Sequence, residues 1–208
     1  MSDFSGKFAP QGPEDGIKLV AENPLGWIVS RHEDMPFATV LPFRARIDQN
    51  GHIFSLQGHF ARANPHLAAL RSSPRALILI LGPNAYVSPS WMADRTQAPT
   101  WNYTSLWFET ELHFFEDREA LRALLSEQVG AMEEGRQNAW QISDMGPRFD
   151  RLASGIVGFD ARVISAHGRF KLGQDEREDV YPDIVRGLKS EGSEAVLEWM
   201  AHFKRAKT

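Results

Sequence analysis

The sequence contains no cysteine in its 208 residues. A disulfide scaffold, a thiolate site for zinc or an iron–sulfur cluster, and a cysteine nucleophile are therefore excluded. The chain also lacks any apolar run close to the roughly 20 residues that span a bilayer. Its first 16 residues are polar, unlike a signal peptide. We therefore expect a cytoplasmic protein that does not associate with a membrane.

An excess of positive charge is missing as well. The chain has 23 Lys and Arg against 27 Asp and Glu, a formal net charge of −4 at pH 7. It therefore lacks the broad positive field that is typical of a duplex-binding protein. Contact with DNA would depend on local basic groups, such as Arg44 and Arg46, or residues 204–207 at the C-terminus. The alternative for residues 204–207 is a solvated helix end that complements the helix dipole.

Familiar catalytic and nucleotide-binding motifs are also absent. The chain has no glycine fingerprint, no phosphate loop and no Gly-x-Ser-x-Gly elbow. Its seven His residues never show the i, i+4 pairing of a helix-borne metal site. We therefore expect no metal site, and the residues by themselves identify no catalytic group.

The composition, 42% apolar and 24% charged, is that of an ordinary globular protein. Its length fits one domain that covers residues 1–208. Residues 1–16 combine Gly, Pro and charges without an apolar period, which predicts a flexible N-terminal arm. An amphipathic pattern after Ser193 predicts a C-terminal helix over about residues 193–207.

Period-two alternation predicts several strands. Apolar residues fall on odd positions over 37–47, and the Asn50-Gly51 turn then favours a second, antiparallel strand over 53–57. Residues 76–81 have no polar member. They predict a strand that is buried on both faces or lies beneath another chain.

The later part of the chain also favours strands. The Pro-rich residues 82–99 are predicted as a loop, and residues 101–115 as a long strand. Residues 157–163, a turn at 166–168 and a return strand over 169–172 predict a final hairpin.

Helices are predicted between these strands. Asn64-Pro65 is typical of a helix entrance. Asp117 caps a helix whose apolar stripe runs from Leu121 to Met132, and a shorter helix covers residues 148–153. Six to seven strands in hairpins with inserted helices predict a small closed antiparallel barrel that is mainly β with α additions.

One stretch, GHFARANP at residues 58–65, is suited to an anion. It places His59 and Arg62 at the end of a strand and Asn64 at a helix N-terminus, where unpaired N–H groups favour phosphate. The Arg fork matches phosphate oxygens. The alternative is that Arg62 is a solvated charge and Asn64 only a helix cap.

Two further stretches, GPNAYVSPSW at 82–91 and PTWNY at 99–103, alternate aromatic residues with hydroxyls and amides. Such a lining suits a flat heteroaromatic ligand, because the rings cover its faces and the polar groups pair with its rim. The alternative is a loop that packs at a subunit contact, where Trp and Tyr are also enriched.

These three stretches, in this order, resemble the PaiB-type FMN-binding split-barrel family, whose members are often named negative transcriptional regulators. The resemblance runs from about Gly51 to Lys171. It implies a six-stranded antiparallel split β-barrel of the pyridoxamine-phosphate-oxidase-like type. It also implies a homodimer with FMN at the subunit boundary.

The resemblance also implies which residues contact FMN. His59, Arg62 and Asn64 become candidates for the phosphate, and Lys171 could reach either the phosphate or the flavin's electron-rich edge. The candidates for the flavin ring are Ser88, Ser90, Trp91, Thr100, Trp101 and Asn102. We expect the phosphate and ring candidates to converge on one crevice.

The final predicted hairpin departs from the family pattern. The family commonly has Lys-x-Ser-Gln-Asn there, and this chain has KLGQD at residues 171–175. Gly173 removes a hydroxyl donor, and Asp175 replaces an amide with a carboxylate that would repel a phosphate. The change predicts weaker FMN binding or a different ligand.

Three functions follow as hypotheses. The first is an FMN-dependent oxidoreductase that acts on a small molecule, with the flavin carrying the electrons. The second is a PaiB-like negative transcriptional regulator that contacts DNA, and the third is a flavin-free dimeric interaction module. Six Trp residues are many large rings for one small barrel to bury, which independently favours a homodimer.

Overall fold

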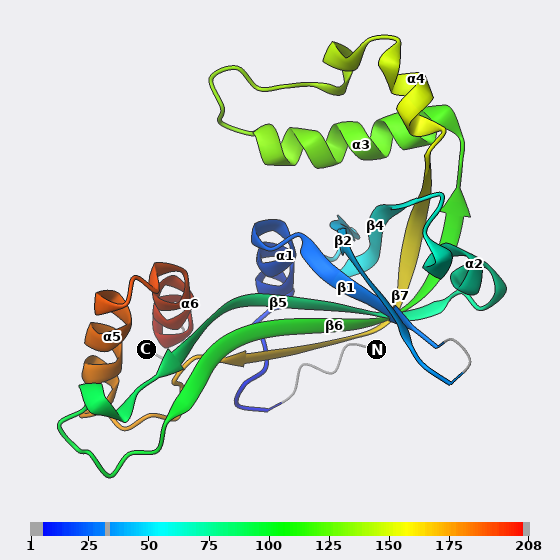
Figure 1. Ribbon diagram of the computed structural model, residues 1–208. Coiled ribbons are helices and arrows are strands. Elements are labelled where there is room, and N and C mark those ends of the chain that lie inside the picture. Colours follow the sequence, from blue (N-terminus) through cyan, green and yellow to red (C-terminus); the bar gives the residue numbers. More distant parts are fainter. Residues whose placement is uncertain (1–5, 32–33, 206–208) are drawn as a thin grey trace. The chain divides into compact units, whose positions relative to one another are not determined.

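The computed structural model describes residues 6–31 and 34–205 (Figure 1). Parts of the predicted N-terminal arm (1–5) and C-terminal helix (206–207) lie outside these residues. No helix in the described part of the chain is both long and apolar enough to cross a bilayer. The strands are β1 Leu25–Ser30, β2 Phe37–Pro42, β3 Arg44–Ile47, β4 Ile53–Ala61, β5 Arg75–Val87, β6 Thr100–Phe115 and β7 Ile156–Lys171. The helices are α1 Pro13–Glu22, α2 Pro65–Ser72, η1 Pro89–Trp91, α3 Arg118–Glu133, η2 Ile142–Met145, α4 Arg148–Ala153, α5 Tyr181–Ser190 and α6 Glu194–Arg205.

The strands form one antiparallel sheet in the order β2-β1-β5-β6-β7-β4-β3. The fold is therefore mainly β with α additions, as predicted. The closed barrel predicted from the strand pattern is wrong, because no ladder among the described strands joins the two outer ones. The described sheet has seven strands, which agrees with the six to seven expected from the pattern and corrects the six implied by the family resemblance.

The seventh strand arises because the single strand predicted over residues 37–47 is two strands. The chain breaks at Phe43, whose side chain is buried and whose N–H donates to the Pro24 carbonyl at 2.7 Å. Before the break, β2 pairs with β1; after it, β3 pairs with β4. Pro42 has no N–H with which to continue a ladder, so this is a natural place for the chain to change partners.

The hairpin predicted around Asn50-Gly51 is confirmed, because β3 and β4 pair antiparallel with Arg44 opposite Gln57. Gly51 has a φ of +80°, which other residues rarely adopt. Asp48 holds the turn together by accepting hydrogen bonds from the N–H groups of Asn50 and His52, both at 2.9 Å.

The prediction of a final hairpin over residues 157–172 is wrong, because β7 continues without a turn from Ile156 to Lys171. Gly168 favoured a turn in the sequence, but in the structure it makes room for Pro10. A Cβ at Gly168 would lie 2.7 Å from Pro10 Cγ. The segment that contains Phe8 lies beside this part of β7, because the Phe170 N–H donates to the Phe8 carbonyl at 2.7 Å.

Two other predicted boundaries change. The loop predicted from residue 82 begins later, because β5 continues to Val87. Within residues 76–81 of β5, only the even positions Ala76, Ile78 and Ile80 are buried, while Leu77 and Leu81 are exposed. The strand is therefore not covered on both faces by its own chain. Helix α1 starts at Pro13, inside the stretch predicted as an arm.

The chain divides into two compact units. The first unit contains residues 6–23, 80–107 and 166–205, and the second contains residues 24–79 and 108–165. The boundaries fall inside β5, β6 and β7. The interpretation of residues 1–208 as one domain stays a prediction.

The second unit has a core of side chains from β1, β4, β5, β6, β7 and α2. His66 lies within it, fully buried, with its ring nitrogens 2.8 Å from the hydroxyls of Ser30 and Thr39. Helix α3, with its predicted cap Asp117, packs with η2 and α4 into a separate small cluster. The main core residues are Ile28, Leu56, Phe60, Leu67, Leu70, Ile78, Phe108, Val157 and Phe159.

The first unit packs α1, α5 and α6 with the other ends of the long strands. The Phe170 ring of β7 lies 5.3 Å from the Trp199 ring and 5.4 Å from the Phe203 ring of α6, measured between ring centroids. Asp15 of α1 is buried and accepts a hydrogen bond at 2.7 Å from the Gln11 N–H, and it pairs with His202 of α6. These contacts fix α1 and α6 to the sheet.

Candidate functional site

The ten predicted FMN contacts are divided between the two units. His59, Arg62 and Asn64 belong to the second unit, at the end of β4 and the start of α2. The seven others belong to the first unit, around the end of β5, the start of β6 and the end of β7. Each group is described within its own unit.

Each of the three guanidinium nitrogens of Arg62 donates a hydrogen bond within its own unit. Its Nη1 donates to Glu116 Oε2 at 2.7 Å, its Nε to the Ser154 carbonyl at 2.9 Å and its Nη2 to the Ile156 carbonyl at 3.2 Å. The guanidinium thus ties the end of β4 to the start of β7. The three bonds use three of the five N–H groups of the guanidinium, so a phosphate oxygen would have to be reached by one of the remaining two.

Glu116 is the carboxylate against which Arg62 lies. It also accepts a hydrogen bond from Arg71 of α2, so it has a guanidinium on each oxygen. The hydrogen bond from Arg62, and then that from Arg71, lower the pKa of Glu116 below its usual value. An ionised Glu116 offsets much of the positive charge that was predicted to attract a phosphate.

Asn64 caps α2, as the alternative interpretation held. Its Oδ1 accepts from the His66 N–H at 2.9 Å, and its carbonyl accepts from the Leu67 N–H at 3.1 Å. Pro65, the first helical residue, has no N–H. These bonds use the donors that the beginning of the helix would otherwise present to an anion.

His59 lies on β4 opposite Gly158 of β7. Burial lowers the pKa of His59 below its ordinary value, although a hydrogen bond with the Gln128 side chain opposes the shift. Its Nδ1 is buried and has no hydrogen-bond partner among the described residues. The ring is therefore favoured in its neutral form, with one polar atom still unsatisfied.

Lys171 is the centre of the group in the first unit. Its Nζ donates to Thr100 Oγ1 at 2.8 Å and to the Trp101 carbonyl at 3.1 Å. The end of β7 thereby lies beside the start of β6, and three predicted contacts from segments 70 residues apart come together.

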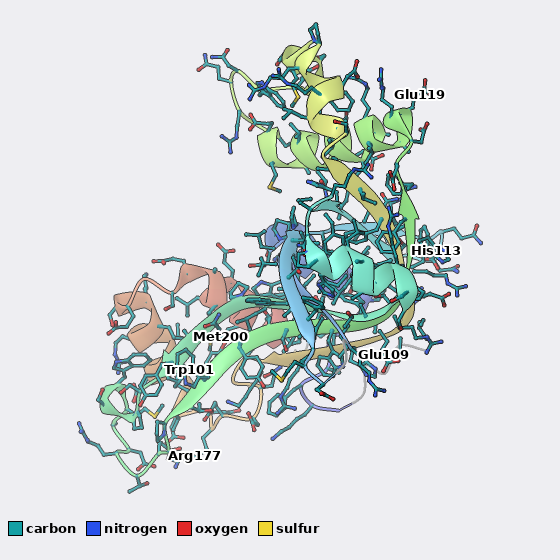
Figure 2. The ribbon with its side chains drawn as sticks, turned by 45° about the vertical axis from the view of Figure 1, so that its right-hand side comes forward. Trp101, Glu109, His113, Glu119, Arg177 and Met200 are labelled. Carbon is teal, nitrogen blue, oxygen red and sulfur yellow. The ribbon has the colours of Figure 1, made fainter. Side chains whose placement is uncertain are left out.

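Aromatic rings are exposed beside this lysine. Trp101 is 53% exposed and Tyr86 is 44% exposed, and their centroids lie 5.8 Å apart in an edge-to-face arrangement. Figure 2 shows Trp101 on β6. Exposed rings next to a cation and polar groups are suited to an aromatic anion.

Asn102, the next residue on β6, is buried at 1% exposure. Its Nδ2 lies 3.4 Å from the Met200 sulfur on α6, and its Oδ1 has no hydrogen-bond partner among the described residues. A buried unsatisfied acceptor is costly, so a donor on a ligand would relieve this cost.

Ser88 caps the short helix η1, and Ser90 and Trp91 lie within it. The two serine hydroxyls are 2.7 Å apart, and Ser88 Oγ also accepts from the Ser90 N–H. The Trp91 ring packs against Gly187 of α5 so closely that a Cβ at Gly187 would overlap it. Trp91 is therefore held between η1 and α5 and is less exposed than Trp101.

Asp175, the acid in the segment 171–175 that differs from the family pattern, has its charge neutralised by a lysine. Asp175 Oδ2 pairs with Lys7 Nζ at 2.6 Å, and this hydrogen bond lowers the pKa of Asp175. Gly173 adopts a φ of +78°, a conformation in which the serine of the family pattern would be strained. The replacement of serine by glycine thus fits the local backbone.

Several contacts of these side chains could not be found from sequence patterns. Glu116 follows a predicted strand without any motif, and Gln128 lies in the middle of a helix. Tyr86 belonged to an aromatic stretch, but its partner Trp101 lies fifteen residues later, so only the pairing of β5 with β6 brings the rings together. Within the described ranges, no three His, Cys, Asp or Glu side chains gather to hold a metal ion.

Comparison with known proteins gives a family match. The sequence model of the family described as "Putative FMN-binding domain" matches residues 5–165. A curated relative, "Protease synthase and sporulation protein PAI 2" from Bacillus subtilis, is 29% identical over 187 residues. The alignment covers 88% of this chain and 87% of the relative.

Solved structures share the fold. A conserved hypothetical protein from Mycobacterium tuberculosis superposes with a TM-score of 0.61 at 16% identity, over 85% of this chain and 95% of that one. An FAD and heme binding protein from Mycobacterium smegmatis gives 0.58 at 16% identity, over 86% and 79%. A flavocytochrome from Azotobacter vinelandii gives 0.59 at 12% identity, over 82% and 76%.

Proposed function

Because the chain belongs to this FMN-binding domain family, we propose that it is a flavoprotein that uses FMN in an oxidoreductase reaction on a small molecule. The family match over residues 5–165 carries the proposal. The curated relative, aligned over most of both chains, supports it. A cytoplasmic location stays a prediction.

The side chains of the first unit fit a flavin. Trp101 and Tyr86 offer exposed aromatic surface, Lys171 offers a cation, and Asn102 Oδ1 offers a buried acceptor that no described residue pairs with. We propose that these groups, with Ser88, Ser90, Trp91 and Thr100, bind and orient the ring system. When bound, FMN supplies the electron transfer, and the protein supplies position and charge.

The phosphate proposal for the second unit has to account for the engagement of Arg62. We propose that Arg62 gives one of its donors to a phosphate while the others continue to hold Ser154 and Ile156, because a guanidinium has five N–H groups. His59 Nδ1, which is buried and has no partner in the part of the chain that the structure describes, is a further group that a ligand could satisfy. Asn64 orders the start of α2 rather than contacting the anion itself.

We propose that the sheet forms part of an FMN-binding split barrel and that the protein is a homodimer. On the second unit, the ladder places Trp27 between Val40 and Leu79, and Val29 beside Leu77, all on one face. Trp27, Val40 and Leu77 are each more than a third exposed. A contiguous apolar sheet face of this kind is typical of an interface.

FMN titration tests the central proposal. Purified full-length protein should quench the fluorescence of FMN with a dissociation constant in the micromolar range or lower. The Lys171→Met variant should bind FMN at least about tenfold more weakly, because a charge-assisted contact is worth roughly 1.5–3 kcal/mol. An absence of quenching at tens of micromolar would instead favour the flavin-free interaction module.

Regulation through DNA is the second candidate, and the family resemblance favours it. The net charge of −4 opposes nonspecific attraction to a duplex. A gel-shift series over increasing salt decides the matter, since phosphate contacts make affinity fall steeply with salt concentration. Binding that does not weaken with salt would exclude direct phosphate contact.

A further inference from the structure

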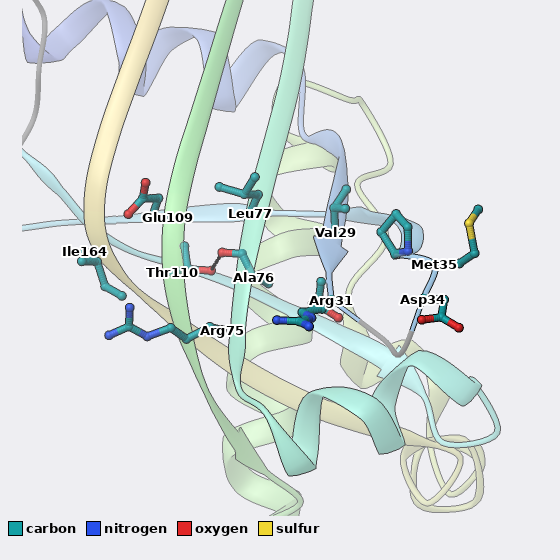
Figure 3. Close-up of a pocket in the computed structure, with 12 residues that line it drawn as sticks. Val29, Arg31, Asp34, Met35, Arg75, Ala76, Leu77, Glu109, Thr110 and Ile164 are labelled. Atoms are coloured by element: carbon teal, nitrogen blue, oxygen red, sulfur yellow. Dashed lines mark hydrogen bonds between the residues drawn. The ribbon is translucent and has the colours of Figure 1, made fainter.

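One pocket of the second unit lies where β1 ends and β5 begins (Figure 3). Val29 and Leu77 line it, and both belong to the apolar face that we propose for the dimer. A different pocket, the α3 pocket, has a volume of about 660 Å³ and lies between α3 and residues 139–143 of the same unit. None of the ten predicted FMN contacts and no residue of β1 lines the α3 pocket.

The floor of the α3 pocket is one face of α3. The lining residues of the helix are mostly three or four positions apart, and such residues share a face because an α-helix has about 3.6 residues per turn. Val129 packs against the buried Ile142 of η2, in the cluster that joins α3, η2 and α4. The floor is therefore apolar and held by packing. The lining residues of α3 are Arg122, Ser126, Val129, Gly130 and Glu133.

Gly130 keeps this floor open. A Cβ built at Gly130 meets no atom within 4 Å. Glycine is less favourable than alanine within a helix, and no described neighbour requires its small size at this position. The missing side chain leaves space beside Val129 that a ligand could fill.

Trp140 lies on the opposite wall, near the end of α3. It is 40% exposed, and its backbone N–H donates to Glu133 Oε2 at 3.1 Å. This hydrogen bond holds residue 140 beside the last turn of the helix. Indole is the aromatic side chain that attracts cations most strongly, so an exposed Trp140 is suited to contact a positively charged group.

The charge around Trp140 is negative. Glu133 and Glu134 both line the pocket, and the Glu134 side chain makes no ion pair or hydrogen bond with any described residue. Arg136 pairs with Glu133 at 3.6 Å and offsets one of the two charges. The C-terminal end of a helix also carries a partial negative charge, and the last turn of α3 has no basic residue to offset it. This end of the pocket therefore favours a cation.

Arg122 is the base among the lining residues, and it lies at the other end of the pocket. It is eleven positions before Glu133, a separation of about 16 Å along a helix. Its guanidinium lies 3.8 Å from the centroid of the Phe149 ring and 3.9 Å from Asp150 Oδ1. It therefore does not repel a cation beside Trp140 at close range.

We propose that the α3 pocket binds a small organic cation with an apolar body, separately from FMN. The cationic group lies between the Trp140 ring and the carboxylates of Glu133 and Glu134, and the body covers Val129 and Gly130. The volume lies within the range of about 300–1,000 Å³ typical of small-molecule sites.

Calorimetric titration of the full-length protein, in its solution oligomeric state, tests the proposal. The probes are benzylamine, which is a cation at neutral pH, benzyl alcohol, which has the same ring without a charge, and benzoate, which is an anion. Benzylamine should bind at least about tenfold more tightly than benzyl alcohol, because only the amine gains the contacts with Trp140 and the carboxylates. Benzoate should bind no more tightly than benzyl alcohol.

Two variants test the two parts of the pocket. Glu134→Gln should weaken benzylamine binding by about two- to fivefold, because it removes the unpaired carboxylate. Gly130→Leu should weaken the binding of benzylamine and benzyl alcohol alike, by about tenfold, because it fills the floor. Leucine is a strong helix former, and thermal unfolding of Gly130→Leu should show that the protein is as stable as the wild type.

Glu119→Gln is the matched control for Glu134→Gln. Glu119 is an exposed acid of the same helix, near its start and outside the pocket lining (Figure 2). This variant should bind benzylamine as the wild type does.

Three results would overturn the proposal. These are no heat of binding with benzylamine at about 10 mM, equal affinities for benzylamine and benzyl alcohol, and wild-type affinity for benzylamine in either Glu134→Gln or Gly130→Leu. FMN fluorescence quenching is measured on the same variants and should be unchanged. Failure of the cation site is therefore distinguishable from failure of FMN binding.

Discussion

At the scale of single residues, the phosphate candidates have structural roles that the sequence does not reveal. Arg62 links β4 to Glu116 and to two carbonyls before β7. Asn64 caps a helix. A variant at Arg62 therefore changes both the stability and any phosphate contact, and the two effects need separate measurements.

Arg62→Ala and Glu116→Gln separate these effects. If Arg62 contacts the phosphate, Arg62→Ala should weaken FMN binding by about 10-fold to 100-fold, or roughly 1.5–3 kcal/mol. Glu116→Gln should leave FMN binding equal or tighter, because it removes the competing carboxylate. Fluorescence titration and thermal unfolding are measured for both. Lower thermal stability with wild-type FMN affinity in both variants would make Arg62 a purely structural residue.

His59 makes stability depend on pH. Its folded-state pKa lies below the ordinary value of 6.5, mainly because the ring is buried. Below that pH the unfolded chain binds the proton more readily than the folded protein does, so the free energy of unfolding should fall as the pH is lowered from about 7.5 to about 5.

The His59→Gln variant should lose this part of the pH dependence. Urea unfolding of both proteins at the two pH values measures the difference, since the six other histidines contribute equally to both. Parallel stability curves for the wild type and the variant would contradict a lowered pKa at His59.

At the scale of elements, the contact between η1 and α5 positions a predicted flavin contact. Gly187→Ala would place a methyl group inside the Trp91 ring. Alanine normally favours a helix over glycine, but this overlap should outweigh that gain and destabilise the protein by about 1–3 kcal/mol. The shifted Trp91 should also weaken FMN binding.

Gly130→Ala is the matched control for Gly187→Ala. Gly130 lies within α3, and no atom lies within 4 Å of a Cβ built there. It should stabilise the protein by about 0.5–1 kcal/mol. Denaturant unfolding of both variants compares them. A stabilising Gly187→Ala would mean that Trp91 is free to move.

Sequence patterns over a few consecutive residues predicted the helices and turns that form through contacts close in the sequence. Asp117 and the apolar stripe located α3, residues 148–153 match α4, and Asn50-Gly51 located the β3–β4 hairpin. Helix α5 was not predicted. The turn at 166–168 failed because Gly168 accommodates Pro10, which is more than 150 residues away in the chain.

The sequence predicted which types of residue could form the candidate site, but it did not predict which contacts those residues make. The three motifs indicated the FMN family, and the proximity of Lys171 to Thr100 and Trp101 agrees with their grouping. Glu116 carries no sequence signal, so the pairing that engages Arg62 could not be foreseen. A spacing pattern identifies groups able to bind a ligand but does not identify which of them the protein's own chain already uses.

At the scale of the whole molecule, the exposed apolar face around Trp27 predicts that the protein forms a dimer. Trp27 lies at its centre on β1 and is 52% exposed. Trp27→Glu should convert the proposed dimer to a monomer, because it places a charge in an apolar interface.

Sedimentation equilibrium at micromolar protein concentration measures this change in mass. Trp140→Glu is the control, since Trp140 is 40% exposed but lies in the loop between α3 and η2 and is not part of the β1 ladders that form the apolar face. It should leave the dimer intact. A wild-type protein that sediments as a monomer would contradict the assembly itself.

The break at Phe43 has a consequence for aggregation. β2 and β3 are the two outer strands of the sheet, and a single residue joins them. Because consecutive Cα atoms are only about 3.8 Å apart, the end of β2 and the start of β3 lie close together within the second unit. β2 has six residues and β3 has four, so neither outer strand offers a long straight row of free amides to a stray strand from another molecule. A protein so rich in long apolar strands should for this reason resist fibril formation while it stays folded.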